Sequence, residues 1–268
     1  MSGQYKSHFK GHGVAFSEHR LYVPGDDVRH IDWKVSARSR DPLIKKYEEE
    51  RELTVFLVVD VSASEQFGSS AKLKSEIASE IAGMLAYAAI HSGDKVGALL
   101  FAGKVEKIVP PKKGRQHVLR LIREVLGYQG PSAVKGTDLK GALESTGRIM
   151  KHGGVIFVIS DFLASDYEVQ LRRLSRRHDV VGVKISDQRE AEIPNVGTIL
   201  LFDPETGSER LVDTSSYAFK KWFTEFRSKH EKETQSAFKS SRVESLNILT
   251  KEDYGEAIVR FFRARARR

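Results

Sequence analysis

The chain has 268 residues, of which 40% are hydrophobic and 30% charged, and it contains no cysteine. This composition is typical of a globular protein with a substantial core, and it excludes disulfides, thiolate zinc sites and a cysteine nucleophile. The net charge of +8 is compatible with nucleic acid, acidic lipid or an acidic protein as partner, and also with a basic surface that only improves solubility. The first residues, MSGQYKSHFKGHG, have no apolar h-region, and no apolar run approaches the ~20 residues of a membrane span. We therefore expect a cytoplasmic protein without a secretory signal or a transmembrane segment.

Residues 1–50 are rich in charge, glycine and turn residues, and YVPGDDVRHIDWK carries a Pro-Gly turn between two strand-like stretches. We interpret them as an arm or hairpin that packs on a main domain formed by residues 51–268. In that domain KVEKIVPP predicts a short edge strand ended by its prolines. Apolar runs predict further, buried strands at 54–60, 95–103, 155–161, 179–186 and 197–203.

Apolar residues at helical spacing fill the intervals between and after these strands. The expected helices lie around Ile77–Ala88, closed by Gly93, and at 116–128, 137–154, 167–178, 217–240 and 249–268. In the helix at 217–240, four aromatic residues share one face and are expected to be buried: Phe219, Trp222, Phe223 and Phe226. Strands that alternate with helices predict an α/β, Rossmann-like fold with a mainly parallel sheet and helices on both faces.

Polar residues follow two of the predicted strands. LTVFLVVDVSASEQFGSS places Asp60, Ser62 and Ser64 after the first strand, and VIFVISD ends a later strand in Asp161. Ligand sites in open α/β folds lie at the carboxyl ends of the strands, so this edge is where function is expected. Taken singly, Asp-x-Ser-x-Ser is typical of a turn or a helix cap, and Thr137 is typical of a helix N-cap.

Taken together and in this order, the polar residues resemble the metal-ion-dependent adhesion site of von Willebrand factor A-type domains. The resemblance implies one divalent cation, Mg²⁺ or Mn²⁺, with hydroxyls as direct ligands, carboxylates acting through water and a partner's carboxylate in an open position. Two residues depart from the pattern, because Glu65 follows the second serine and Phe162 follows the last aspartate. The implied metal residues are Asp60, Ser62, Ser64, Thr137 and Asp161.

A second resemblance covers nearly the whole chain. GHGVAFSEHRLYVPGDDVRHIDWKVSARS, the following EEERELTVFLVVDVSAS and the C-terminal EDYGEAIVRFFRARARR are similar to the bacterial MoxR-associated branch of this superfamily, domain of unknown function 58. The resemblance implies a cytosolic partner of a MoxR-type AAA+ ATPase that acts on an unknown client protein in a chaperone-like maturation system. The residues that carry it are Pro24, Gly25, Asp26, Asp27, Arg29, Ile31, Asp32, Trp33, Ser36, Ala37 and Arg38. They are expected either to dock the ATPase or to form an ion-pair network of Arg29, Asp32 and Arg38 under Trp33.

Sequence signatures of catalysis are missing. There is no G-x-x-x-x-G-K-[ST] for nucleotide binding, no H-E-x-x-H and no G-x-S-x-G, so ATP hydrolysis is expected of a partner. Basic clusters lie at 104–115, 172–177 and 260–268. Nucleic-acid binding would need aromatic residues interleaved with such clusters, and the aromatics are expected to be buried.

We therefore expect a non-catalytic protein-interaction module that binds a divalent cation. Two alternatives stay open from the sequence: an interaction module whose metal site is vestigial, and a basic nucleic-acid-binding protein.

Overall fold

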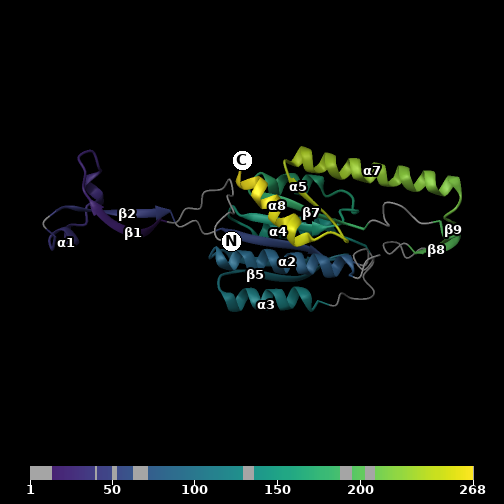
Figure 1. Cartoon of the computed structure of the whole chain (residues 1–268), viewed down its shortest axis with the longest axis horizontal. Coiled ribbons are helices and arrows are strands. Elements are labelled where there is room, and N and C mark those ends of the chain that lie inside the picture. The colour runs from purple at the N-terminus through teal and green to yellow at the C-terminus, as the bar shows by residue number, and fades with distance from the viewer. Residues whose placement is uncertain are drawn as a thin grey trace. The chain divides into compact units, whose positions relative to one another are not determined.

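The computed structural model describes residues 14–39, 41–49, 53–62, 72–128, 136–187, 195–202 and 209–267. The chain forms two compact units, Lys10–Glu52 and a larger unit that includes Leu53–Arg268. Each is considered by itself (Figure 1).

The smaller unit is a hairpin with a helical connection. Strand β1 (Val14–Leu21) pairs antiparallel with β2 (Leu43–Glu49), and the connection contains the 3-10 helix η1 (Val28–His30) and the short helix α1 (Trp33–Ser36). The Pro-Gly turn places Gly25 at φ +111°, a conformation that glycine adopts without strain. The predicted hairpin is therefore present, and its packing on the larger unit stays a prediction.

A six-stranded sheet forms the centre of the larger unit. The strand order is β10-β7-β6-β3-β4-β5, with every pairing parallel except that of β4 with the edge strand β5. Numbered along the chain, this order is the doubly wound 3-2-1-4-5-6. The strands are β3 (Thr54–Asp60), β4 (Lys95–Phe101), β5 (Val105–Lys112), β6 (Val155–Ser160), β7 (Asp179–Ser186) and β10 (Glu244–Leu249).

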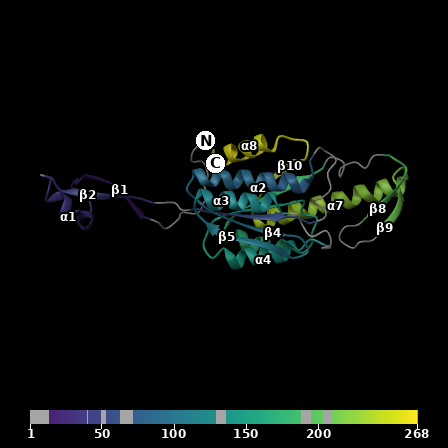
Figure 2. The same cartoon turned by 90° about the horizontal axis from the view of Figure 1, so that it is seen from below.

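Helices cover both faces of this sheet (Figure 2). On one face α2 (Lys74–His91), α3 (Arg115–Leu126) and α8 (Tyr254–Ala266) enclose a core of apolar strand residues such as Leu57 and Phe157. On the other face α4 (Leu139–Ile149), α5 (Glu168–Ser175) and α7 (Tyr217–Ser241) enclose a second core that includes Phe56 and Phe238. The central strands have no solvent-facing side, which explains their continuous apolar runs. The predicted Rossmann-like α/β fold is confirmed.

Two features at the C-terminal side differ from the expectation. The run at 197–203 does not join the main sheet: β8 (Thr198–Phe202) pairs antiparallel with β9 (Glu209–Asp213) in a separate hairpin. The sixth sheet strand is β10, which no continuous apolar run predicts, because most of its residues are half-buried or exposed. The edge strand β5 continues through both of its prolines to Lys112, because an edge strand has one side without hydrogen-bond partners.

Candidate functional site

The site lies at the switch point of the sheet. The adjacent parallel strands β3 and β6 are its two central strands. From β3 the chain continues to β4 on one side, and from β6 it continues to β7 on the other. The connections that follow the two strands run to opposite faces of the sheet, α2 to one and α5 to the other. Open α/β sheets bind ligands in the crevice that forms at such a point. Asp60 is the last residue of β3, and Asp161 directly follows the last residue of β6.

Asp60 is fully buried and held on both carboxylate oxygens. Its Oδ2 accepts a hydrogen bond from Ser160 Oγ at 2.7 Å, and its Oδ1 accepts one from the Ser62 backbone N–H at 3.0 Å. Burial raises the pKa of the Asp60 carboxyl well above its ordinary value, and the nearby Asp161 raises it further, against the hydrogen bonds from Ser62 and Ser160. The two predicted aspartates are thus close enough to repel each other.

Asp161 has a partner that sequence reasoning missed. Its Oδ2 accepts a hydrogen bond from the ammonium of Lys74 at 3.0 Å, and its Oδ1 accepts one from the Leu163 backbone N–H at 3.1 Å. Both side chains are buried, Lys74 completely. Lys74 is the first residue of α2, and nothing in its sequence neighbourhood distinguishes it from a surface lysine.

The other predicted site residues are Ser62, Ser64 and Thr137. Ser62 is buried beside Asp60. Thr137 is half-buried before α4, but it is Asp138 that caps this helix, by accepting a hydrogen bond from Gly141 N–H at 2.8 Å. Ser64 lies outside the described residues. The structure therefore brings Asp60, Ser62 and Asp161 together. The backbone N–H of Asp138, next to Thr137, donates to the Ala102 carbonyl at 2.7 Å, just beyond the end of β4. A shared role of all five residues stays a prediction.

These residues fit a divalent cation only in part. Carboxylate and hydroxyl oxygens are the ligands that Mg²⁺ prefers. The ammonium of Lys74, however, already places a positive charge on Asp161 Oδ2. Across the parts of the chain that the structure describes, no group of three or more His, Cys, Asp or Glu side chains could hold a metal ion. The donor chemistry suits a cation, and the buried lysine does not.

Phe162, the departure from the adhesion pattern, has an unusual backbone. Its φ is +58°, in the left-handed region that favours glycine. Its side chain is buried and makes an edge-to-face contact with Phe238, with ring centroids 4.9 Å apart. Packing of this ring offsets a backbone cost of about 1–2 kcal/mol. The turn after Asp161 is thus held by the core beneath it.

A cavity of about 160 Å³ opens beside Asp161 at the carboxyl ends of β6 and β7. Part of its wall comes from α7 and mixes aromatic and charged side chains. Lys184 on β7 and Glu231 on α7 form an ion pair in this wall. The lining residues are Asp161, Leu163, Lys184, Ile185, Ser186, Phe223, Phe226, Arg227, His230 and Glu231.

Helix α7 continues the wall outward as an exposed aromatic surface. Its buried residues all lie in its second half, from Thr234 to Ser241, while its first half runs toward the β8–β9 hairpin (Figure 1). The expectation that its aromatic face is buried is wrong for Trp222, which is 53% exposed, and for Phe226, which is 43% exposed. Phe219 and Phe223 are half-buried. The helix is longer than the sheet face that it covers, so its first half has no core to enter. We call Phe219, Trp222, Phe223 and Phe226 the α7 aromatic surface.

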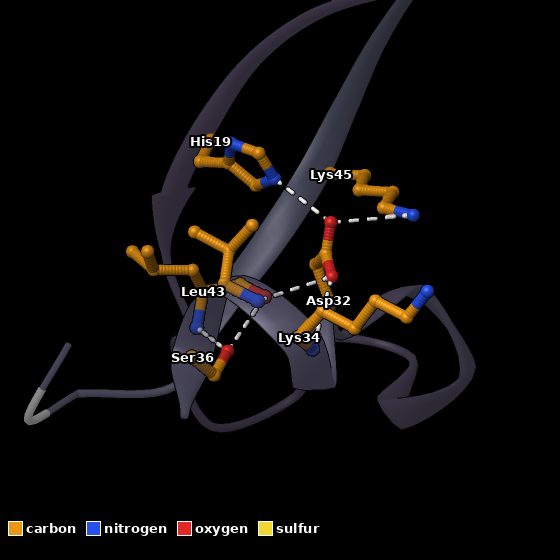
Figure 3. A network of polar contacts seen from close by, with 7 residues as sticks. His19, Asp32, Lys34, Ser36, Leu43 and Lys45 are labelled. Carbon is orange, nitrogen blue, oxygen red and sulfur yellow. Dashed lines mark hydrogen bonds and ion pairs between the residues drawn. The ribbon is translucent and has the colours of Figure 1, made fainter. Parts of the chain in front are cut away.

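In the smaller unit, Asp32 organises a network different from the expected one (Figure 3). Its carboxylate pairs with His19 at 3.1 Å and Lys45 at 3.3 Å, and it caps α1 through the Lys34 and Val35 N–H groups. The hydrogen bond from His19 is the main reason that the pKa of Asp32 falls to about 2.

The two arginines expected in that network are not part of it. Arg29 pairs with Asp27 instead, and none of the described contacts joins Arg38 to Asp32. Trp33 is 68% exposed and covers no network. Sequence proximity suggested these partners, but β1 and β2 bring His19 and Lys45 across the hairpin to Asp32.

A six-stranded sheet in this order, with helices on both faces, is the Rossmann-like α/β fold of von Willebrand A-type domains. The chain belongs to the family described as protein of unknown function DUF58, whose model matches residues 18–233. Among the described residues, no helix is long and apolar enough to cross a lipid bilayer.

Comparison with known proteins finds relatives in sequence and solved structures with a similar fold. Rv1480 of Mycobacterium tuberculosis and Mb1516 of Mycobacterium bovis are each 33% identical to this chain over its whole length, which covers 84% of theirs. A crystal structure of BatB from Bacteroides thetaiotaomicron is similar with a TM-score of 0.52 and 12% identity, over 80% of this chain and 98% of that one. An aerotolerance-related membrane protein from Bacteroides fragilis gives 0.54 and 18%, over 79% and 99%. At these identities the structures indicate the fold alone.

Proposed function

We propose that this protein is a non-catalytic protein-interaction module that binds its partner at the cavity beside Asp161 and along the α7 aromatic surface. The observation that carries the proposal is the exposure of stacked aromatic side chains next to a cavity at the switch point. A surface of large apolar side chains is costly to leave in water and marks interaction sites. Tryptophan and other aromatic residues also carry most of the binding energy in many interfaces.

The charge around the α7 aromatic surface indicates the chemistry of the partner. Over residues 217–230 the basic side chains are Lys220, Lys221, Arg227 and Lys229, against the single acidic Glu225. A partner segment that carries acidic residues beside an apolar anchor complements this surface. The family resemblance favours a MoxR-type AAA+ ATPase as the protein that supplies the segment, with an unknown client as a further partner.

A binding measurement with matched variants tests this proposal. The full chain is titrated against the MoxR-type ATPase of the same organism by biolayer interferometry, as wild type, as Trp222→Ala/Phe226→Ala and as Tyr87→Ala. Tyr87 is 54% exposed on α2, on the opposite face of the sheet, and serves as the control. We expect the double variant to bind at least about tenfold more weakly and Tyr87→Ala to bind like wild type.

Equal binding by all three proteins would contradict the proposal. Binding to single-stranded nucleic acid that weakens steeply with salt, and that the double variant loses, would assign the surface to nucleic acid instead.

The cation-assisted form of this function is a second candidate. The convergence of Asp60, Ser62 and Asp161 favours it, and the resemblance adds Ser64 and Thr137, Mg²⁺ or Mn²⁺, and a carboxylate from the partner. The contact of Lys74 with Asp161 argues against it. Calorimetric titration of Mg²⁺ into wild type and Asp60→Ala distinguishes the cation-assisted function from the cation-independent one. If binding is cation-assisted, wild type should bind Mg²⁺ and Asp60→Ala should not.

A further inference from the structure

Lys74 occupies a position that disfavours a positive charge. Its side chain is completely buried, and burying an ammonium is costly unless a counter-charge and hydrogen bonds satisfy it. It is also the first residue of α2, where the unpaired backbone N–H groups of a helix carry positive partial charge. An apolar side chain would avoid both costs. The reason for the charge must therefore lie in the surroundings of Lys74.

Those surroundings are two carboxylates that need a cation. Asp60 and Asp161 are both buried at neighbouring strand ends, where their charges repel each other. In the adhesion site that the sequence resembles, a divalent ion provides the compensating charge. Here the ammonium of Lys74 lies 3.0 Å from Asp161 Oδ2. The chain thus supplies from its own helix the charge that the carboxylates require.

We propose that Lys74 is the resident cation of this site and excludes a divalent ion from Asp161. A divalent ion bound to the same carboxylate would lie within a few ångströms of the ammonium, in a buried site where like charges are weakly screened. The site would then hold the ends of β3 and β6 together without metal. Because Lys74 has no exposed surface, a partner's carboxylate does not reach it. Recognition is left to the cavity and the α7 aromatic surface, but the inference itself does not depend on the ATPase.

Removing the ammonium should convert the site into a metal site. The test uses the full chain as wild type, Lys74→Met, Lys74→Arg and Lys72→Met, titrated with MnCl₂ and MgCl₂ by calorimetry. Methionine keeps the length and volume of the side chain without its charge, and arginine keeps a charge. Lys72 is the matched control, because it is a half-exposed lysine two residues away that pairs with Glu80. We expect Lys74→Met to bind Mn²⁺ at least about tenfold more tightly than the other three proteins.

Lys74→Met leaves two buried carboxylates without their counter-charge, so its folding is followed as well. The melting temperature of each protein is measured with and without Mn²⁺, since a ligand that binds only the folded state raises it. A Mn²⁺-dependent rise in Lys74→Met that wild type and Lys72→Met lack supports the inference. Wild type that binds Mn²⁺ as tightly as Lys74→Met would overturn it, as would a Lys74→Met protein that neither binds Mn²⁺ nor is stabilised by it.

Discussion

Globular proteins usually bury apolar side chains and expose charged ones, and two regions of this protein depart from that rule. The carboxyl edge of the sheet buries charged residues, and the first half of α7 exposes aromatic ones. At the sheet edge, charged residues such as Asp60, Asp161 and Lys74 are buried. On α7, large aromatic residues such as Trp222 are exposed. Buried charges and exposed apolar surfaces are the informative deviations in a globular protein, because each costs stability. One residue of each region, Asp161 and Phe226, lines the same cavity, which indicates that this end of the molecule is shaped by something other than stability.

The two regions nevertheless differ in what they can bind. The carboxylates at the sheet edge are satisfied within the chain, by Ser160, by Lys74 and by backbone N–H groups. In the α7 aromatic surface, rings such as those of Trp222 and Phe226 stack at 5.5 Å between centroids and still expose much of their area to solvent. The carboxylates at the sheet edge, whose hydrogen bonds come from within the chain, therefore stabilise the fold. The exposed rings of the α7 aromatic surface remain available to a partner.

The largest expected effect tests whether the two halves of α7 really differ. Phe238, in the second half, packs against Gly182 and Phe162, so Phe238→Ala should lower the free energy of unfolding by about 3–5 kcal/mol. Phe226→Ala is the same substitution in the exposed half and should cost less than about 1 kcal/mol. Urea unfolding followed by circular dichroism measures both. A large loss for Phe226→Ala would mean that the first half of α7 is part of the core, and the comparison would fail.

A second substitution, with a similar expected effect, tests the account of the turn after Asp161. Phe162→Ala should lower the free energy of unfolding by about 3–5 kcal/mol, because it removes a buried ring and keeps a strained backbone. Phe162→Gly loses the same ring but relieves the left-handed conformation, so it should be about 1 kcal/mol more stable than Phe162→Ala. At most positions the glycine variant of a protein is less stable than the alanine variant. If urea unfolding instead shows that Phe162→Gly is less stable than Phe162→Ala, the left-handed backbone at this position does not cost stability.

The sequence predicted the elements whose patterns are local. The valine-rich runs at β3 and β6 have no exposed side, and the aspartates that follow them mark where the strands end. Those two features, with the alternation of strands and helices, predict that Asp60 and Asp161 lie at the same carboxyl edge of a parallel sheet.

The errors have a common physical cause, which is that burial depends on what lies opposite an element. The aromatic face of α7 has the period of a buried helix, but the sheet ends before the helix does. The strand at β8 is apolar enough for the main sheet, yet β10 takes the edge position beside β7. Lys74 shows the same limit, since no local pattern reveals a lysine that will face a carboxylate 87 residues later in the chain.

The smallest effect compares the satisfied carboxylates with one at the opposite end of the sheet. Asp94 precedes β4 and is buried, its Oδ1 accepts a hydrogen bond from Leu53 N–H at 3.2 Å, and its Oδ2 has no partner within the described residues. Burial raises the pKa of Asp94 to about 6. Asp94→Asn keeps the acceptor without the charge, so we expect it to raise the free energy of unfolding at pH 8 by about 1–2 kcal/mol.

The pH dependence of that gain separates the charge of Asp94 from its shape. The folded protein holds the Asp94 proton more tightly than the unfolded chain, so wild type loses stability as pH rises from about 4 through about 6. The advantage of Asp94→Asn should therefore be absent below pH ~4 and complete above pH ~7 in urea unfolding. Asp253→Asn is the control, because Asp253 is an exposed cap of α8 where asparagine caps equally well. An advantage that is constant with pH would mean that packing, and not an unpaired buried charge, distinguishes Asp94 from the carboxylates that Lys74 and Ser160 satisfy.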